Sequence, residues 1–482
     1  MTSFKDNNQE ENKINLDKTN SQVRSSNQRN NEEKGSKSSL KSSAPSESQK
    51  IYKYDERMRK AQNLLIFMAT CLILDYFLLQ DLLFHESIKH SQYLRKNYPS
   101  KNFDLFCQIV SELCDKYGIS VVLFICYQLL DHPKSFTISV CTAFGQGLIC
   151  MLKSLNNEPR PFFVADLKPY KCRLEHGNPS GHTLIVVALY ACAVQQFIRQ
   201  YSILRRNKTL VWTGYIVVAG FIGFGRIYNG VHTHNQVIAG YIWGFATYYT
   251  FTHLLQYEIY QFIMNVKNKS FPQLIWNPFT QGFVICYLVQ VGLYFYGSKN
   301  NPTPQLWLDN IVKNCENVDL HADPELQNFE KYNISFSLIG ALLGISIEQR
   351  IMGTSQFHDF FKTSPSTTFK RLIVGGSIGL GNMVPFLVSK HNSFWIVLLC
   401  RNIVPVVFGS IHIFGLSKYF TYRFGLINET VREGISYEEV MGQDDQTEQE
   451  EIGQNKNVSI NQNTNKNGKQ KQIQVQQSKK HK

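Results

Sequence analysis

The chain has 482 residues, 43% of them hydrophobic, and a formal net charge of +13 at pH 7. A soluble protein of this length would have two or three domains. Recurring apolar segments near the ~20 residues that cross a bilayer exclude that organisation. The charge does not indicate a nucleic-acid-binding protein, because it lies mostly in the tails and at loop ends, without a folded basic face.

Polar tails flank the apolar segments. Residues 1–62 and 424–482 are rich in Asn, Gln, Ser, Lys and Glu. They bury too little apolar surface to offset chain entropy, so they are predicted to be disordered tails in the cytosol. The first 60 residues contain no apolar segment typical of a cleavable signal. The first span is therefore expected to act as an uncleaved anchor.

Between the tails, hydropathy predicts about ten membrane spans: 63–84, 108–130, 137–152, 182–199, 209–227, 235–256, 279–297, 333–349, 371–389 and 393–415. The predicted fold class is therefore all-α, a polytopic helical membrane protein with about 9–10 transmembrane helices. We expect residues 63–260 to form a helical membrane core with an extra N-terminal span. Residues 261–423 are expected to form C-terminal membrane helices.

Most of the eleven cysteines are not candidates for disulfides. Seven lie inside apolar segments, where cysteine behaves as a small hydrophobe: Cys71, Cys126, Cys141, Cys150, Cys192, Cys286 and Cys400. Cys172 and Cys315 lie in polar loops on one predicted face. Either a bridge between them or two free thiols fits the sequence.

Six polar residues at span ends fall on one side of the membrane when the spans are counted alternately from the N-terminus: Lys153, Arg160, Ser180, His182, Arg226 and His232. Each alone has an ordinary explanation, such as a snorkelling flank charge, an interfacial histidine or a helix N-cap. Their convergence on one face favours a single site.

The residue types in this group suit phosphate chemistry. Two arginines and a lysine match phosphate oxygens, and the Ser180 hydroxyl with the N–H groups of Gly181 and His182 adds anion donors at a helix N-terminus. Of the two histidines, one can attack phosphorus while the other gives a proton to the leaving alcohol. No metal or other cofactor is required, because the cations neutralise the phosphate charge.

The segments "KSLNNEPRP" (153–161), "PSGH" (179–182) and "RIYNGVH" (226–232) resemble the three-part signature of the type 2 phosphatidic acid phosphatase and vanadium haloperoxidase superfamily. The resemblance implies a six-helix phosphatase core, with His232 as the nucleophile that forms a phosphohistidine and His182 as the general acid. It also implies a phosphate-binding set: Lys153, Arg160, Ser180, Gly181 and Arg226.

Two positions depart from most members of that superfamily: Gly225 replaces a serine, and Gln236 replaces an aspartate four residues after the histidine. "HTHNQVIAG" (232–240) is similar to the glucose-6-phosphatase branch, which carries a glutamine there. Further similar segments extend the resemblance over roughly 92–415: "QYLRKNYP" (92–99), "CRLEHGNPSGH" (172–182), "LWLDNIVKNCENVDLHAD" (306–323) and "LLCRNIVPV" (398–406).

Gln236 is a candidate catalytic residue because it lies one helical turn after His232. Its carbonyl is expected to accept a hydrogen bond from the His232 Nδ1–H, leaving Nε2 free to attack. His234 is the rival partner, although two residues' separation should point it towards another face.

This resemblance implies a membrane-bound, metal-independent phosphomonoester hydrolase that converts glucose-6-phosphate to glucose and phosphate, as in gluconeogenesis. The alternative is a lipid phosphate phosphatase for sphingosine-1-phosphate, phosphatidate or isoprenoid phosphate, because "RIYNGVH" suits that family nearly as well. Outside enzymes, a catalytically inactive scaffold or an anion transporter would use the same charges, but an anion site needs no paired histidines.

Charge asymmetry predicts the sidedness of the membrane protein. Basic residues crowd the approach to the first span and the loop at 199–208, which places the tails in the cytosol and the site in the lumen. The terminal "KKHK" resembles a dilysine retrieval signal of the endoplasmic reticulum, although a Lys-rich tail also matches it by chance. A lumenal site implies a sugar-phosphate transporter as a partner.

Overall fold

The computed structural model describes residues 47–74, 80–169, 171–315, 324–352, 364–380, 399 and 403–426. The chain divides into two units, Met1–Lys60 and Ala61–Lys482, and the site lies wholly within the second. Residues 1–46 and 427–482, which make up most of the two predicted tails, lie outside the described residues. The first described helix begins at Glu47, well before the predicted start of the first span.

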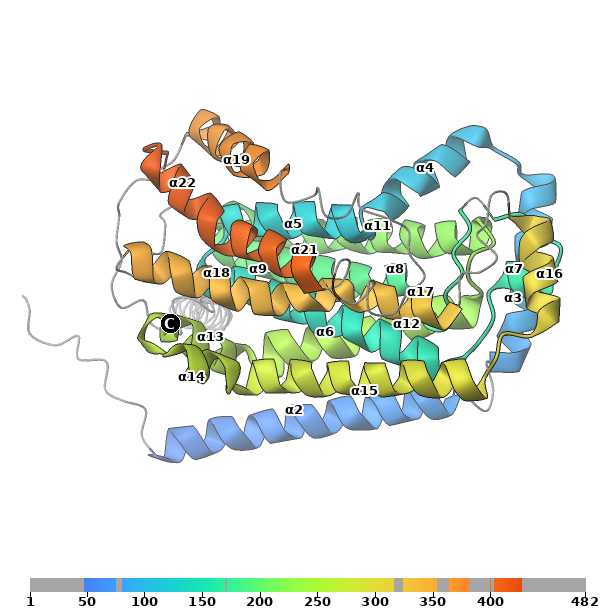
Figure 1. The fold of residues 1–482 in the computed structure, drawn as a ribbon, viewed down its shortest axis with the longest axis horizontal. Coiled ribbons are helices and arrows are strands. Elements are labelled where there is room, and N and C mark those ends of the chain that lie inside the picture. The colour runs from blue at the N-terminus through green and yellow to red at the C-terminus, as the bar shows by residue number, and fades with distance from the viewer. Residues whose placement is uncertain are drawn as a thin grey trace, which may run out of the picture. The chain divides into compact units, whose positions relative to one another are not determined.

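The described residues form helices, turns and loops without strands, which confirms the all-α fold class (Figure 1). In chain order the helices, with η marking 3-10 and π-helical turns, are α2 (Glu47–Leu74), α3 (Gln80–Asn97), α4 (Lys101–Glu112), α5 (Lys116–Leu129), α6 (His132–Asn156), α7 (Pro161–Val164), α8 (Gly181–Ile185), η2 (Val186–Ala191), α9 (Cys192–Gln200), α10 (Ser202–Arg206), α11 (Lys208–Tyr228), α12 (His234–Tyr249), η3 (Thr250–Leu254), α13 (Gln256–Met264), η4 (Val266–Asn268), α14 (Phe271–Ile275), α15 (Pro278–Asn300), α16 (Gln305–Asn314), α17 (Pro324–Glu330), η5 (Lys331–Phe336), α18 (Ser337–Met352), α19 (Pro365–Leu380), α21 (Val404–Ile411), η9 (His412–Leu416) and α22 (Ser417–Arg423).

Five of these helical segments are long and apolar enough to cross a membrane: His132–Val164, Gly181–Gln200, Lys208–Tyr228, Pro278–Asn300 and Pro324–Ile351. They coincide with five of the ten predicted spans. The other predicted spans fall on shorter helices, such as Lys116–Leu129, or lie partly outside the described residues.

The predicted span at 108–130 is not one helix. α4 ends at Glu112 and α5 begins at Lys116, with Asp115 at its N-cap position. The charged side chains of this break line the cavity described below rather than crossing an apolar layer. The interruption therefore contributes to the site.

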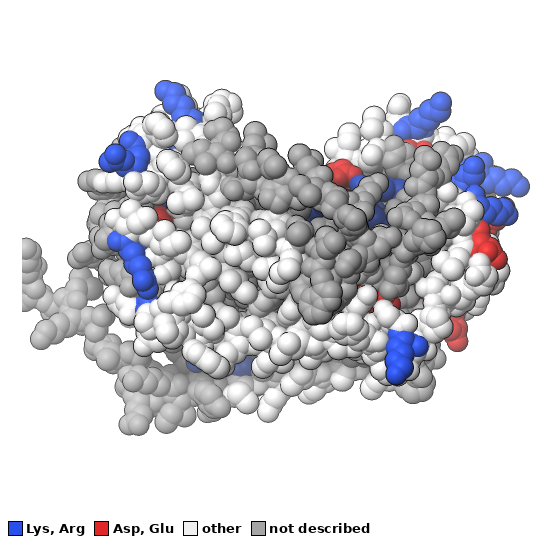
Figure 2. All heavy atoms as spheres, in the orientation of Figure 1, with Lys and Arg blue, Asp and Glu red and all other residues white. Residues whose placement is uncertain are grey.

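The outer surface of the helices is consistent with a lipid environment. Large apolar side chains stand exposed on α11 and α15, including Leu210, Ile216, Ile285 and Leu288. On the face drawn in Figure 2, the described charged side chains gather towards the two ends and leave the middle largely uncharged. A membrane protein needs this pattern, because charged groups are costly in the bilayer centre.

α6 is the central helix of the described core and packs against α5, α8, α9, α13, α15 and α18 (Figure 1). Its many hydroxyls are buried without cost to the fold, because they donate to carbonyl oxygens one turn back. Examples are Ser135 to Asp131 at 2.9 Å and Thr142 to Ile138 at 2.7 Å. Side chains that are small and already hydrogen-bonded within their own helix let neighbouring helices approach closely.

Glycines on α12 allow it to approach α8 closely. A Cβ at Gly240 would stand 2.6 Å from the Ser180 carbonyl oxygen and 2.0 Å from Thr183 Oγ1, and one at Gly244 would stand 2.7 Å from the Leu184 oxygen. The spacing of four residues puts both glycines on one helix face. This contact fixes the start of α8 beside the start of α12.

A small apolar cluster covers the end of the helices where α7 and α16 meet, at the right of Figure 1. It contains Phe162, Phe163 and Val231 among others. The Cys172–Cys315 disulfide joins the loop before α8 to the end of α16 beside this cluster. Of the two alternatives that the sequence allowed, a bridge or two free thiols, the structure has the bridge.

We expect Gly240→Ala to lower turnover at the predicted site roughly a hundredfold, because displacing the start of α8 by about an ångström misplaces the side chains there. Gly220→Ala on α11 is the matched control, since no atom lies within 4 Å of the added Cβ. The measurement is kcat of both purified variants. Equal activity of the two variants would show that the α8–α12 contact does not set the site.

Candidate active site

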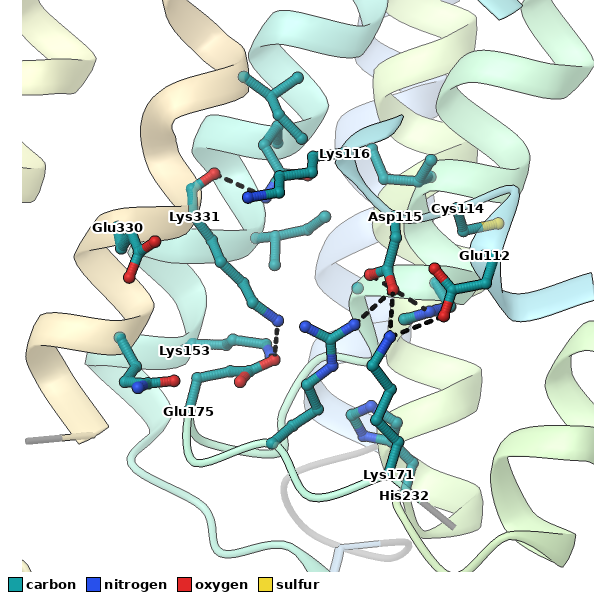
Figure 3. Close-up of a pocket in the computed structure, with 18 of the residues that line it drawn as sticks. Glu112, Cys114, Asp115, Lys116, Lys153, Lys171, Glu175, His232, Glu330 and Lys331 are labelled. Carbon is teal, nitrogen blue, oxygen red and sulfur yellow. Dashed lines mark hydrogen bonds and ion pairs between the residues drawn. The ribbon is translucent and has the colours of Figure 1, made fainter. Parts of the chain in front are cut away.

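Helix ends from separate parts of the chain meet around a cavity of about 230 Å³. Lys153 lies in the last turn of α6, Arg160 stands at the N-cap position of α7, and Gly181 and His182 begin α8. His232 lies in the turn between α11 and α12. All five line the cavity, and Figure 3 shows Lys153 and His232 on its walls.

Two of the predicted phosphate-binding residues lie beside this cavity rather than on its wall. Arg226, in the last turn of α11, lines a smaller pocket to which His182 also contributes. Ser180 is fully buried at the N-cap position of α8, where its hydroxyl makes no capping hydrogen bond. The structure therefore gathers the predicted phosphate-binding residues at one place.

Several buried polar atoms at this place have no hydrogen-bond partner among the described residues: Ser180 Oγ, His182 Nε2 and Arg226 Nε. A buried donor without a partner costs free energy. A tetrahedral oxyanion offers several acceptor oxygens to donors that converge in this way. The chemistry of these atoms therefore fits phosphate.

Arg160 joins three segments of the site. Its Nη2 donates to Glu175 Oε1 at 2.8 Å and its Nε donates to the Glu175 carbonyl oxygen at 2.7 Å. Its Nη1 donates to the Val231 carbonyl oxygen at 2.9 Å and lies 3.1 Å from His232 Nε2. The guanidinium is 1% exposed, so these contacts fix its position.

His232 and Gln236 form the hydrogen bond that their spacing predicts. His232 Nδ1 lies 3.0 Å from Gln236 Oε1. The rival residue His234 is turned away, since its backbone N–H donates to Ser87 Oγ at 2.7 Å and its Nε2 lies 3.3 Å from His90 Nδ1.

The tautomer of His232 follows from its neighbours. A guanidinium can only donate, so the Nε2 facing Arg160 is the acceptor and Nδ1 carries the proton. Burial, with the charges of Arg160, Arg226 and Lys153, lowers the pKa of His232 well below its usual range, against an opposing effect of Gln236. The imidazole is therefore neutral at neutral pH, with an unprotonated Nε2 that accepts from Arg160.

His182 faces an acid that the sequence analysis did not include. Its Nε2 lies 3.9 Å from Asp115 Oδ1, in the break between α4 and α5. Asp115 also pairs with Arg173 and, at 3.3 Å, with Lys171 (Figure 3). This acid is therefore shared between a histidine and two cations.

Sequence reasoning also missed Glu175 and Lys331. The Glu175 carboxylate lies 3.5 Å from Lys153 and forms ion pairs with Arg160 and Lys331 (Figure 3). The available signals were an acid inside the basic segment at 172–182, charges interrupting an apolar segment near 112–116, and a lysine directly before the span at 333–349. None of these signals specifies a partner.

Glu175 neutralises the cations of the site. Burial alone would raise the pKa of its carboxyl, but the charges of Lys331, Lys153 and Arg160 outweigh burial and hold that pKa well below its usual range. A depressed carboxyl pKa stabilises the fold above the unfolded value of about 4.3 and loses this effect as pH falls through the folded value. At pH 7 the stabilisation is complete.

Glu175→Gln is expected to lower the melting temperature at pH 7, because removing one partner of a buried charge cluster costs about 3–5 kcal/mol. Inorganic phosphate should raise the melting temperature of this variant more steeply than that of the wild type, since the uncompensated cations bind it more tightly. Glu325→Gln is the control, because Glu325 pairs with His176 instead. Parallel phosphate dependence in all three proteins would contradict this role of Glu175.

Comparison with known proteins finds a family domain in the part of the chain that carries this site. Residues 135–260 match the PAP2 superfamily model, and this range contains every predicted site residue. The chain is 26% identical over 263 residues to glucose-6-phosphatase catalytic subunit 1 of Bos taurus, covering 49% of this chain and 68% of the relative. It is 23% identical over 354 residues to the protein of the same name from Rattus norvegicus, covering 67% and 91%.

Among solved structures, the chain is similar to a transmembrane PAP2 type phosphatidylglycerolphosphate phosphatase from Bacillus subtilis. The sequence identity is 18% and the TM-score is 0.35, over 43% of this chain and 97% of that one. Because this TM-score is low, the similarity of the chain to a family is taken from the family model and the curated relatives alone. The chain is a membrane phosphatase that carries a PAP2 superfamily domain at residues 135–260 and resembles the glucose-6-phosphatase catalytic subunits.

Proposed function

We propose that this phosphatase hydrolyses glucose-6-phosphate to glucose and phosphate through a phosphohistidine on His232. The observation that carries the proposal is the meeting of two histidines with Lys153 and Arg160 around one cavity. A transporter or scaffold that only holds an anion has no use for a neutral histidine beside those cations.

The proposed mechanism uses these side chains in two displacements. Lys153, Arg160, Ser180, Gly181 and Arg226 hold the phosphate oxygens. His232 Nε2 attacks phosphorus, the ester P–O bond breaks, and His182 gives a proton to the leaving sugar oxygen. Water then attacks the phosphohistidine, His182 takes a proton from it, and phosphate leaves His232.

The remainder of the cavity favours a sugar over a lipid. Beyond the proposed phosphate site, its lining includes side chains that hydrogen-bond with hydroxyl groups: Glu112, Lys116, Gln146, Gln327, Glu330 and Lys331. A lipid phosphate phosphatase remains the second candidate, because Ile149, Ile185 and Ile334 also line the cavity. The names of the curated relatives support the sugar phosphate.

The proposed location is the endoplasmic reticulum membrane, with the site in the lumen and the tails in the cytosol. The basic loop at 199–208 and the terminal "KKHK" support this orientation. A lumenal site would receive its substrate through a sugar-phosphate transporter. The Cys172–Cys315 disulfide is consistent with the oxidising lumen, since both cysteines belong to the side that carries the site.

The first test concerns the chemistry. His232→Ala should abolish turnover and the acid-labile phosphoenzyme, because it removes the nucleophile. His182→Ala should slow turnover while some phosphoenzyme still forms from p-nitrophenyl phosphate, whose leaving group needs little protonation. Rapid quenching with labelled substrate measures both effects. Normal turnover in His232→Ala would end the mechanism.

The second test concerns substrate and sidedness. Microsomes that carry the protein should hydrolyse glucose-6-phosphate in preference to sphingosine-1-phosphate and phosphatidate, since the polar cavity wall satisfies sugar hydroxyls. Detergent should raise the rate in microsomes that lack a sugar-phosphate transporter, because a lumenal site is otherwise out of reach. Preference for either lipid would establish the second candidate, and equal rates with and without detergent would place the site in the cytosol.

A further inference from the structure

The carboxylate of Glu158 lies directly behind the glutamine that contacts His232. Gln236 Nε2 donates to Glu158 Oε1 at 2.8 Å and to the Pro159 carbonyl oxygen at 2.9 Å. Glu158 is 7% exposed. A line of hydrogen bonds therefore runs from His232 through Gln236 to a buried acid.

The direction of every hydrogen bond in this line is determined. His232 Nδ1 carries the proton, so Gln236 must present its Oε1 to it. The same Oε1 faces the Thr233 backbone N–H at 3.3 Å. On the other side of the amide, Glu158 and the Pro159 carbonyl offer only oxygen acceptors, so Nε2 belongs there.

The amide has no room to turn. A Cβ at Gly177 would stand 2.4 Å from Gln236 Nε2. The Gly177 backbone N–H donates to the Glu158 carbonyl oxygen at 2.8 Å, which holds this segment against the amide. The Gln236 side chain is thus fixed between His232 and Glu158.

The other side-chain contacts of Glu158 are with amide donors. Asn235 Nδ2 donates to Oε1 at 2.9 Å and Asn178 Nδ2 donates to Oε2 at 2.7 Å. Gln80 Nε2 lies 3.5 Å from Oε2. Both carboxyl oxygens accept from amide donors, as a carboxylate does. Among the described residues no lysine or arginine forms an ion pair with Glu158, so its charge acts on the amides around it.

We propose that Glu158 is a positioning residue for the nucleophile, which supplies through Gln236 the negative charge that an aspartate at position 236 would supply directly. This inference rests on the proposed role of His232. When Nε2 bonds to phosphorus, the imidazole becomes cationic, and the Nδ1–H bond to Gln236 strengthens. The carboxylate polarises that amide and stabilises the cation, without any proton changing its site.

The test is a double-mutant cycle between Glu158→Gln and Gln236→Leu. Glu158→Gln should lower kcat and the rate of phosphoenzyme formation about 10–100-fold, with KM for the substrate nearly unchanged. Because Glu158 acts through Gln236, it should lower neither rate further in the Gln236→Leu background. A multiplicative loss in the double variant, or full activity of Glu158→Gln, would overturn the proposal.

Controls separate this role from a general loss of structure. Glu348→Gln neutralises another buried acid, which pairs with His132 at 3.1 Å, and should leave kcat unchanged. Inhibition by inorganic phosphate and formation of the Cys172–Cys315 bridge report folding. If Glu158→Gln fails these checks, Glu158→Asp replaces it, and its kcat loss must likewise vanish in the Gln236→Leu background.

The outcome is distinguishable from failure of the proposed function. If His232→Ala still forms the phosphoenzyme, the nucleophile is wrong, and both the proposed function and the role of Glu158 fail. If His232→Ala is inactive while Glu158 and Gln236 act independently, the proposed function stands and this inference alone fails.

Discussion

The position of the Arg160 guanidinium is the constraint on which the rest of the site depends. It connects the start of α7, the loop that carries Glu175 and the turn that carries His232 through hydrogen bonds of 2.7–3.1 Å. Because the guanidinium is planar and always charged, these contacts also set the tautomer of His232. One buried side chain therefore joins three segments of the site and sets the tautomer of its histidine.

Concentrating cations at one point has an electrostatic cost that the fold offsets with acids. Glu175 lies among Lys153, Arg160 and Lys331, and Asp115 lies between His182 and Arg173. These acids do not occupy every donor of the site, since Ser180 Oγ, His182 Nε2 and Arg226 Nε have no hydrogen-bond partner among the described residues. The site is thus stable enough to fold and still able to bind an anion.

The membrane setting explains why the site is built at helix ends. Charged side chains are tolerated where helices leave the apolar layer, and helix N-termini there add oriented N–H groups. Close packing through Gly240 and Gly244 brings two such ends, the starts of α8 and α12, next to each other. The membrane therefore requires the apolar lengths of the helices, and the site requires the polar groups at their ends. The packing of these helices meets both requirements.

Much of this site was determined by the sequence alone. Hydropathy predicted the five long apolar helices of the described residues, alternation of the spans predicted that Lys153, His182 and Arg226 share one side, and a one-turn spacing predicted the pairing of His232 with Gln236. These features depend on local periodicity and on motifs within short segments. Only the tertiary structure decided that Glu175 meets Lys331 and that Cys172 meets Cys315, because such partners lie far apart in the chain and local patterns do not encode which distant loops pack together. The same holds for the break at Asp115, where a tertiary role for charge overrides an apolar pattern.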